Sequence, residues 1–273
     1  MKRLSLLLLL VALPTLAAER VVSIGGDVTQ IVYALGAQQD LVARDSTSMQ
    51  PAQANKLPDI GYMRKLNAEG ILALHPTLVL ASEQAKPSVV LQQLSQSGVK
   101  VVEVTGDNSL QAISSKISTI GKALHREQEA TALEAKVSKQ LAQLSHQPLP
   151  VKVLFIMSHS GMKAMAAGTQ TAADSAIHEA GLVNAMAAVP HYQELSQEGV
   201  VAAAPDLVVV GSDGLQSFGG EEKVWQLPGL ALTPAGKHHN LLVVDEMALL
   251  GFGLDTPKAI VQLRKAAESL KHE

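Results

Sequence analysis

The chain has 273 residues, of which 47% are hydrophobic and 17% charged, a composition typical of a folded protein with a sizeable core. The net charge of −3 and the aromatic content of 3% argue against a nucleic-acid-binding protein, which needs a basic face and aromatic side chains for base stacking. The sequence contains no cysteine, so disulfides, thiolate metal sites and cysteine nucleophiles are excluded.

The first residues have the pattern of a secretory signal peptide. Lys2 and Arg3 precede the mostly apolar run Leu4–Leu13, and small residues follow up to Ala18. The apolar run is too short for a permanent membrane-spanning helix. We therefore predict that residues 1–18 are a cleaved signal peptide and that the mature protein is a periplasmic monomer.

Strand and helix patterns alternate through the first half of the chain, which favours a parallel α/β sheet. We assign residues 19–124 to an N-terminal lobe. Its predicted strands are Arg20–Gly25, Leu41–Ala43 and Val99–Val104, and its predicted helices are Asp27–Leu35 and Val89–Ser97.

Two segments of the chain repeat each other. Residues 66–81 read LNAEGILALHPTLVLA and residues 195–210 read LSQEGVVAAAPDLVVV. The shared pattern predicts a short helix, capped by Asn67 in the first copy, followed by a nearly continuous apolar strand. One helix–turn–strand unit is therefore built twice, once in each lobe.

The segment between the repeats has helical apolar spacing and almost no glycine or proline. We predict one long linking helix over residues 125–147, about 20 residues and roughly 30 Å long. Such a helix would be a stiff connection between two lobes.

The second half of the chain, residues 148–273, is predicted to form a C-terminal lobe. The fold class is α/β, with two Rossmann-like lobes whose parallel sheets are joined by the long helix and whose ligand lies in the interlobe cleft. The predicted elements are strands Val151–Met157 and Leu241–Asp245, a helix at Thr171–Ala180, a polar loop at Gly211–Gly220 and a closing helix over residues 256–270.

This organisation resembles the substrate-binding proteins of iron-siderophore, cobalamin and haem ABC importers. The segments RVVSIGGDVTQIVYALGA, LPDIGYMRKLNAEGILAL and VWQLPGLALTPAG are most similar to the periplasmic haem-binding proteins of Gram-negative haem uptake systems. The resemblance implies a protein that captures haem and delivers it to an inner-membrane ABC permease dimer, with an outer-membrane haem receptor acting upstream.

Three residues are candidate haem-iron ligands. A tyrosine phenolate is a hard donor suited to ferric iron, and Arg64 follows Tyr62 closely enough to stabilise its negative charge. His159 follows a predicted strand, where α/β lobes place ligand-facing groups. The resemblance implies that Tyr62 ligates the iron, that Arg64 bonds to Tyr62, and that His159 can be the second axial ligand. His191, which precedes the second repeat as Tyr62 precedes the first, is the other candidate for that second position.

Glu69 and Glu198 occupy matching positions in the two repeats. Each lies in the first turn of its predicted helix, where a carboxylate suits the helix dipole. The resemblance implies a further role, in which one glutamate on each lobe docks into a basic pocket of the permease.

Several alternatives stay open at this point. A ferric-siderophore or cobalamin carrier is the alternative within the family. A periplasmic enzyme is the alternative from another class, although no G-x-S-x-G or metallohydrolase signature is present, and we predict that the protein is not an enzyme. The sequence also leaves open whether the cleft holds one haem or two stacked haems.

Overall fold

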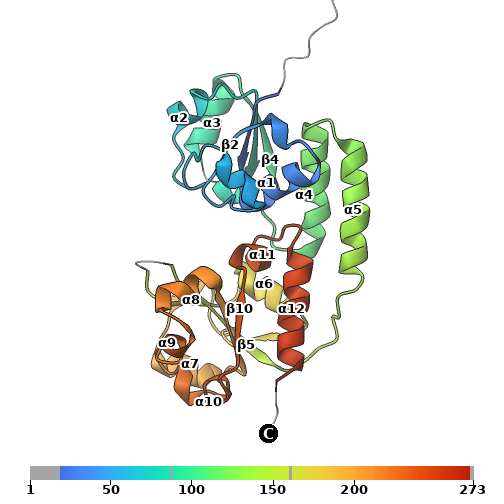
Figure 1. Cartoon of the computed structure of the whole chain (residues 1–273). Helices are drawn as coiled ribbons and strands as arrows, with labels where there is room; N and C mark the ends of the chain where they lie inside the picture. Colours follow the sequence, from blue (N-terminus) through green and yellow to red (C-terminus); the bar gives the residue numbers. More distant parts are fainter. Residues whose placement is uncertain (1–18, 87, 160–161, 271–273) are drawn as a thin grey trace, which may run out of the picture.

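Two α/β lobes are stacked one above the other, with a pair of helices running along one side (Figure 1). The computed structural model describes residues 19–86, 88–159 and 162–270. The predicted signal peptide, residues 1–18, lies outside the described residues. The two-lobed α/β class predicted from the sequence is confirmed.

The N-terminal lobe contains a four-stranded sheet in the order β2-β1-β3-β4, and every pair in it is parallel. Its inner strands are fully buried, which explains why each is apolar except for one serine. The strands are β1 (Val21–Ile24), β2 (Leu41–Arg44), β3 (Leu78–Ser82) and β4 (Lys100–Val104), and the helices between them are α1 (Gly26–Ala34), α2 (Ala68–Leu72) and α3 (Val89–Gln96).

The C-terminal lobe contains a mixed sheet in the order β10-β9-β5-β6-β8, with β7 paired to β5. Only part of this sheet is parallel, because the few residues between β5 and β6 cannot form the crossover that a parallel neighbour needs. The strands are β5 (Lys152–Met157), β6 (Met165–Ala167), β7 (Val183–Asn184), β8 (Tyr192–Glu194), β9 (Leu207–Gly211) and β10 (Leu241–Val244), and the helices include α6 (Ala172–Glu179), α7 (Gln197–Ala203) and α8 (Ser212–Phe218). Helix α8 replaces most of the predicted loop at Gly211–Gly220.

The repeated helix–turn–strand unit is present in both lobes as α2–β3 and α7–β9. In the first copy, the Asn67 side chain accepts a hydrogen bond from the backbone nitrogen of Gly70 at 3.1 Å. In the second copy, Ser196 accepts the equivalent bond from Gly199 at 3.1 Å. The same local capping chemistry therefore starts both helices.

The predicted linking helix over residues 125–147 is shorter than expected. Helix α4 (Leu110–Ala123) and helix α5 (Glu127–Leu141) form an antiparallel pair, visible side by side in Figure 1. His125 has a φ of 55° and separates the two helices. Helix α5 has 15 residues, about 22 Å at 1.5 Å per residue, and an irregular segment containing Pro148 then leads to β5.

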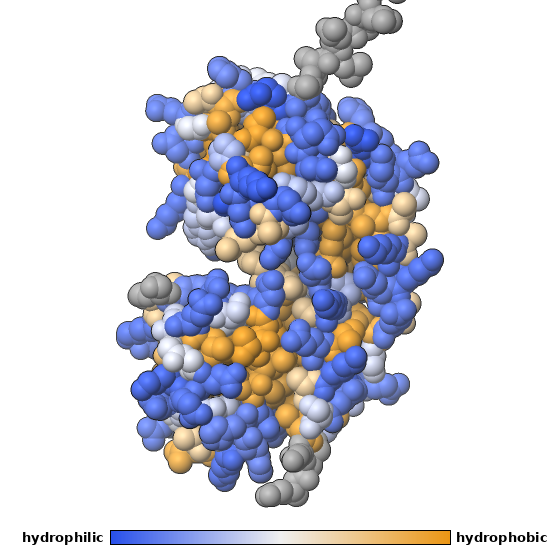
Figure 2. All heavy atoms as spheres, in the orientation of Figure 1, coloured by the Kyte–Doolittle hydropathy of each residue, from blue (hydrophilic) through white to orange (hydrophobic). Residues whose placement is uncertain are grey.

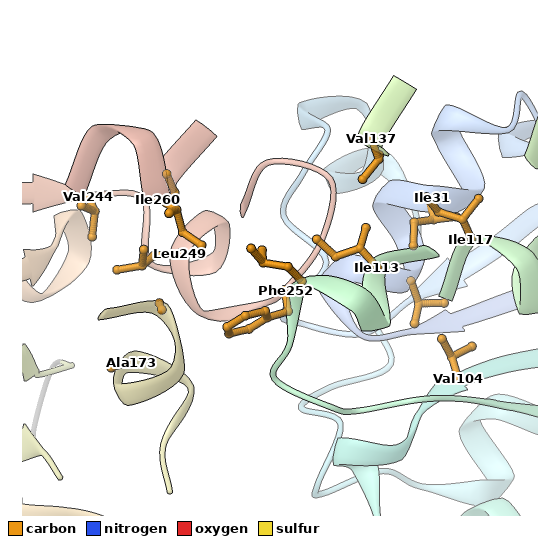
Figure 3. Packing of buried hydrophobic residues seen from close by; sticks show 14 of the residues in the cluster. Ile31, Val104, Ile113, Ile117, Val137, Ala173, Val244, Leu249, Phe252 and Ile260 are labelled. Carbon is orange, nitrogen blue, oxygen red and sulfur yellow. The ribbon is translucent and has the colours of Figure 1, made fainter. Parts of the chain in front are cut away.

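One hydrophobic core runs through both lobes. Figure 3 shows Phe252 between Leu249 on one side and Ile113 of α4 on the other. Phe252 belongs to the turn between α11 (Glu246–Leu250) and α12 (Thr256–Glu268), and it is fully buried. The C-terminal lobe is therefore anchored in the apolar core of the N-terminal lobe.

A buried lysine reinforces this junction. Lys116 of α4 is fully buried, and its Nζ lies 2.7 Å from Oδ2 of Asp27 at the start of α1. The same Nζ donates to the backbone oxygens of Gly251 at 3.2 Å and Phe252 at 3.0 Å. Because these partners come from both lobes, Lys116 fixes the lobes relative to each other at their junction.

Candidate functional site

The surface is hollowed between the two lobes (Figure 2). At the inner end of this cleft lies a cavity of about 220 Å³, lined by residues that follow the carboxyl ends of strands in both lobes. Gly26 and Thr47 follow β1 and β2, whereas Ser212 and Glu246 follow β9 and β10. Parallel α/β sheets place their ligand sites at this edge, so the cleft is the candidate functional site.

Tyr62 is on a loop that is fixed to the end of β2, and it is not among the residues that line the cleft cavity. Asp59 forms a β-bridge with Arg44 of β2, and their side chains form an ion pair at 2.7 Å. The backbone oxygen of Gly61 then accepts a hydrogen bond from Ser46 at 3.0 Å, next to a residue that lines the cleft. The Tyr62 side chain is 45% exposed, which leaves its phenol accessible as a ligand.

Arg64 is on the same loop, and its guanidinium is anchored to the neighbouring strand end. Its Nε donates to the backbone oxygen of Gln84, just after β3, at 3.2 Å. Among the described residues no hydrogen bond joins Arg64 to Tyr62. The two side chains share the carboxyl edge of the N-terminal sheet, but the expected direct bond between them is not formed in this structure.

His159 occupies the corresponding edge of the C-terminal lobe, two residues beyond the end of β5. Its side chain is 46% exposed, and its Nε2 lies 3.6 Å from Oε1 of Glu246. Burial raises the pKa of Glu246, the nearby carboxylates of Asp213 and Asp245 act in the same direction, and His159 opposes them. The His159 imidazole therefore lies next to the largely buried carboxylate of Glu246, which lines the cleft.

His191 lies at the other end of the C-terminal sheet. Strand β6 runs antiparallel to β5, and its first residue, Met165, pairs with the last residue of β5. The chain then moves away from the cleft along β6 to Thr169, whose backbone oxygen accepts a hydrogen bond from His191 at 2.8 Å. The structure thus separates His191 from His159. The repeat breaks down here because β8 takes the place of the loop that carries Tyr62.

Glu69 and Glu198 are exposed in the first turns of α2 and α7, one in each lobe. Neither residue lines the cleft cavity. Helix α2 lies at the upper left of the N-terminal lobe and α7 in the lower part of the C-terminal lobe in Figure 1. They are therefore available for contacts outside the cleft.

None of the four predicted cargo-binding residues is in the cavity lining, and three lining residues that the sequence analysis did not single out are notable. Met49 and Met247 line the cleft from opposite lobes and are 51% and 38% exposed, so they supply polarizable apolar surface. Glu246 follows directly after the predicted strand Leu241–Asp245, and the rule that ligand-facing groups follow parallel strands could have identified it.

Two further searches concern the described residues alone. Within residues 19–86, 88–159 and 162–270, no three His, Asp or Glu side chains gather in the arrangement of a metal-ion site. In the same part of the chain, no helix combines the length and the apolar character needed to cross a bilayer.

Two α/β lobes with a cleft between them form an architecture in which a ligand is bound between domains. A family model for periplasmic binding proteins matches residues 21–248, and the chain belongs to that family. The chain is similar to the periplasmic haem-binding protein RhuT from Roseiflexus sp. RS-1, with 37% identity, a TM-score of 0.86 and coverage of 92% of this chain and 98% of that one.

A second solved structure, the periplasmic haem-binding protein BhuT in complex with two haems, is 34% identical with a TM-score of 0.86, over 93% of this chain and 100% of that one. Among curated proteins, the vitamin B12-binding protein of Yersinia pestis is 40% identical over 96 residues. That match spans 35% of this chain and 34% of the relative, about a third of each.

Proposed function

We propose that this protein is a periplasmic substrate-binding protein that captures haem and delivers it to an inner-membrane ABC transporter. The observation that carries the proposal is an exposed phenol, Tyr62, on a loop attached to the end of β2, together with an exposed imidazole, His159, next to the cleft residue Glu246. Similarity to RhuT and BhuT over more than nine-tenths of the chain supports haem as the cargo.

The two side chains suit the two faces of a ferric porphyrin. Tyr62 binds the iron as a phenolate, and His159 binds it as a neutral imidazole. Arg64, on the same loop, would contribute a positive charge near the iron-bound phenolate. Met49 and Met247 contact the macrocycle edge from the two lobes.

The two ligands serve either one haem held between the lobes or two stacked haems with one ligand each. BhuT holds two haems, which makes the second arrangement a specific candidate. Titration with hemin, followed by the Soret absorption, gives the number directly. A break at one equivalent would assign a single shared haem, and a break at two equivalents would assign a stack.

Delivery requires a docking surface as well as a cargo site. We assign this role to Glu69 and Glu198, exposed carboxylates in the first turns of α2 and α7. Opposite charges on the permease would orient the carrier over the channel and speed encounter. The N-terminal signal pattern supports export, and removal of residues 1–18 would release a monomeric carrier into the periplasm.

Hemin titration of Tyr62→Phe tests the cargo assignment. We expect this variant to lose the tyrosinate charge-transfer bands and to bind hemin at least tenfold more weakly, because the iron loses its phenolate ligand. Tyr33→Phe is the matched control, since Tyr33 is a half-buried tyrosine on helix α1, away from the loop that carries Tyr62. A Tyr62→Phe protein with the spectrum and affinity of the parent would contradict the assignment.

A second candidate cargo is cobalamin, favoured by the local 40% identity to the vitamin B12-binding protein. A parallel titration with cyanocobalamin separates the two cargoes. We expect no saturable change with cyanocobalamin at concentrations that saturate with hemin.

A further inference from the structure

Glu246 lines the cleft, and its carboxylate is closely packed against the end of β9. It is the first residue of α11, and its side chain is only 17% exposed. A methyl group on Gly211, at the end of β9, would lie 2.5 Å from its Oε2 and 3.1 Å from its Cβ. Because Gly211 has no side chain, there is room beside it for the carboxylate of Glu246.

The surroundings of Glu246 do not neutralise it. Its Oε2 is buried and has no hydrogen-bond partner among the described residues. Asp213 and Asp245 are also negative, and the phenol of Tyr192 lies in the field of Glu246. Nε2 of His159 lies 3.6 Å from Oε1, just beyond hydrogen-bond distance, and it is the group in this set that can turn an N–H towards the carboxylate.

A purely structural role for Glu246 is already filled by its neighbour. The side chain of Asp245 caps α11 by accepting a hydrogen bond from the backbone nitrogen of Ala248 at 3.1 Å. Asp245 is exposed, whereas burying the carboxylate of Glu246 without a hydrogen-bond partner for Oε2 is unfavourable, so its location next to the imidazole calls for another explanation.

We propose that Glu246 is a positioning residue for His159. It accepts the N–H of one ring nitrogen, which fixes the tautomer and orientation of the imidazole and leaves the lone pair of the other nitrogen free for the iron of the cargo. Carboxylates behind metal-binding histidines act in this way and raise the basicity of the ligand. The inference rests on the proposed function, because it assigns His159 as a ligand to the haem iron.

The proposal predicts that Glu246 acts on cargo binding only through His159. In hemin titrations, Glu246→Gln should weaken affinity by about tenfold, the lower end of the effect of losing an outer-shell partner. In a His159→Ala background the same substitution should cause no further loss. Glu194→Gln is the matched control, because Glu194 is an exposed carboxylate of the same lobe that pairs with Lys163.

A measurement without cargo separates this inference from the proposed function. The ¹⁵N resonances of the His159 imidazole should indicate one dominant tautomer in the parent and a mixture in Glu246→Gln, with thermal unfolding verifying that the variant is folded. Unchanged resonances, an unchanged hemin affinity in Glu246→Gln, or an equal loss of affinity in both backgrounds would overturn the positioning role. If the parent bound no hemin, the proposed function would fail while the resonances still decided the pairing of Glu246 with His159.

Discussion

Replacing Lys116 with methionine should strongly destabilise the protein. The substitution keeps an apolar side chain of similar length but removes an amine whose side chain is 1% exposed. It leaves the Asp27 carboxylate, 9% exposed, without its partner at 2.7 Å. It also leaves the carbonyls of Gly251 and Phe252 without the donor that satisfies them.

The expected loss is about 3–5 kcal/mol, the usual cost of removing one member of a buried ion pair. A typical domain has a free energy of unfolding of about 5–15 kcal/mol, and such a loss would be a large fraction of it. Much of it comes from the stranded carboxylate, so Lys116→Met combined with Asp27→Asn should lose less than Lys116→Met alone.

Urea unfolding followed by circular dichroism measures the effect. Lys122→Met, at an exposed position on the same helix, is the control and should change the free energy of unfolding by at most about 0.5 kcal/mol. A Lys116→Met protein as stable as this control would refute the view that the buried amine holds the two lobes together.

Two further predictions concern Tyr192 and the docking glutamates. Burial, assisted by the charge of Glu246, raises the pKa of Tyr192 from 10.0 to about 12, so its stabilising effect should be complete below pH 10 and fall as the pH rises towards 12. Unfolding measured across this range should show that extra loss in the parent and not in Tyr192→Phe. Glu69→Lys with Glu198→Lys should leave hemin affinity within twofold of the parent but abolish haem uptake, and normal uptake would remove the docking role.

The sequence correctly predicted the features that depend on neighbouring residues. Mostly apolar runs predicted strands β1, β5 and β9, because a strand covered on both faces is apolar over most of its length. Asn67 was correctly predicted as a helix cap, since the bond it accepts comes from Gly70, three residues away. The repeated helix–turn–strand unit could also be recognised in the sequence, because its pattern depends on residues that are close together in the chain.

The sequence did not predict features that depend on packing between elements. The break between α4 and α5 was missed. There Gly121 packs so closely against α5 that an added methyl group would lie 2.5 Å from Cβ of Ala130. His191 matched Tyr62 along the sequence, yet strand β8 places it at the opposite end of its sheet from the cleft.

The sequence by itself determined two α/β lobes and their shared repeat, and it predicted two candidate ligands, Tyr62 before the first repeat and His159 after a strand. Only the tertiary structure revealed the contacts that join the two lobes and the carboxylate that lies next to the His159 imidazole. Lys116 contacts a carbonyl 135 residues away along the chain, and Glu246 reaches His159 from a different strand. Such contacts leave no local pattern, because they form only when the whole chain has folded.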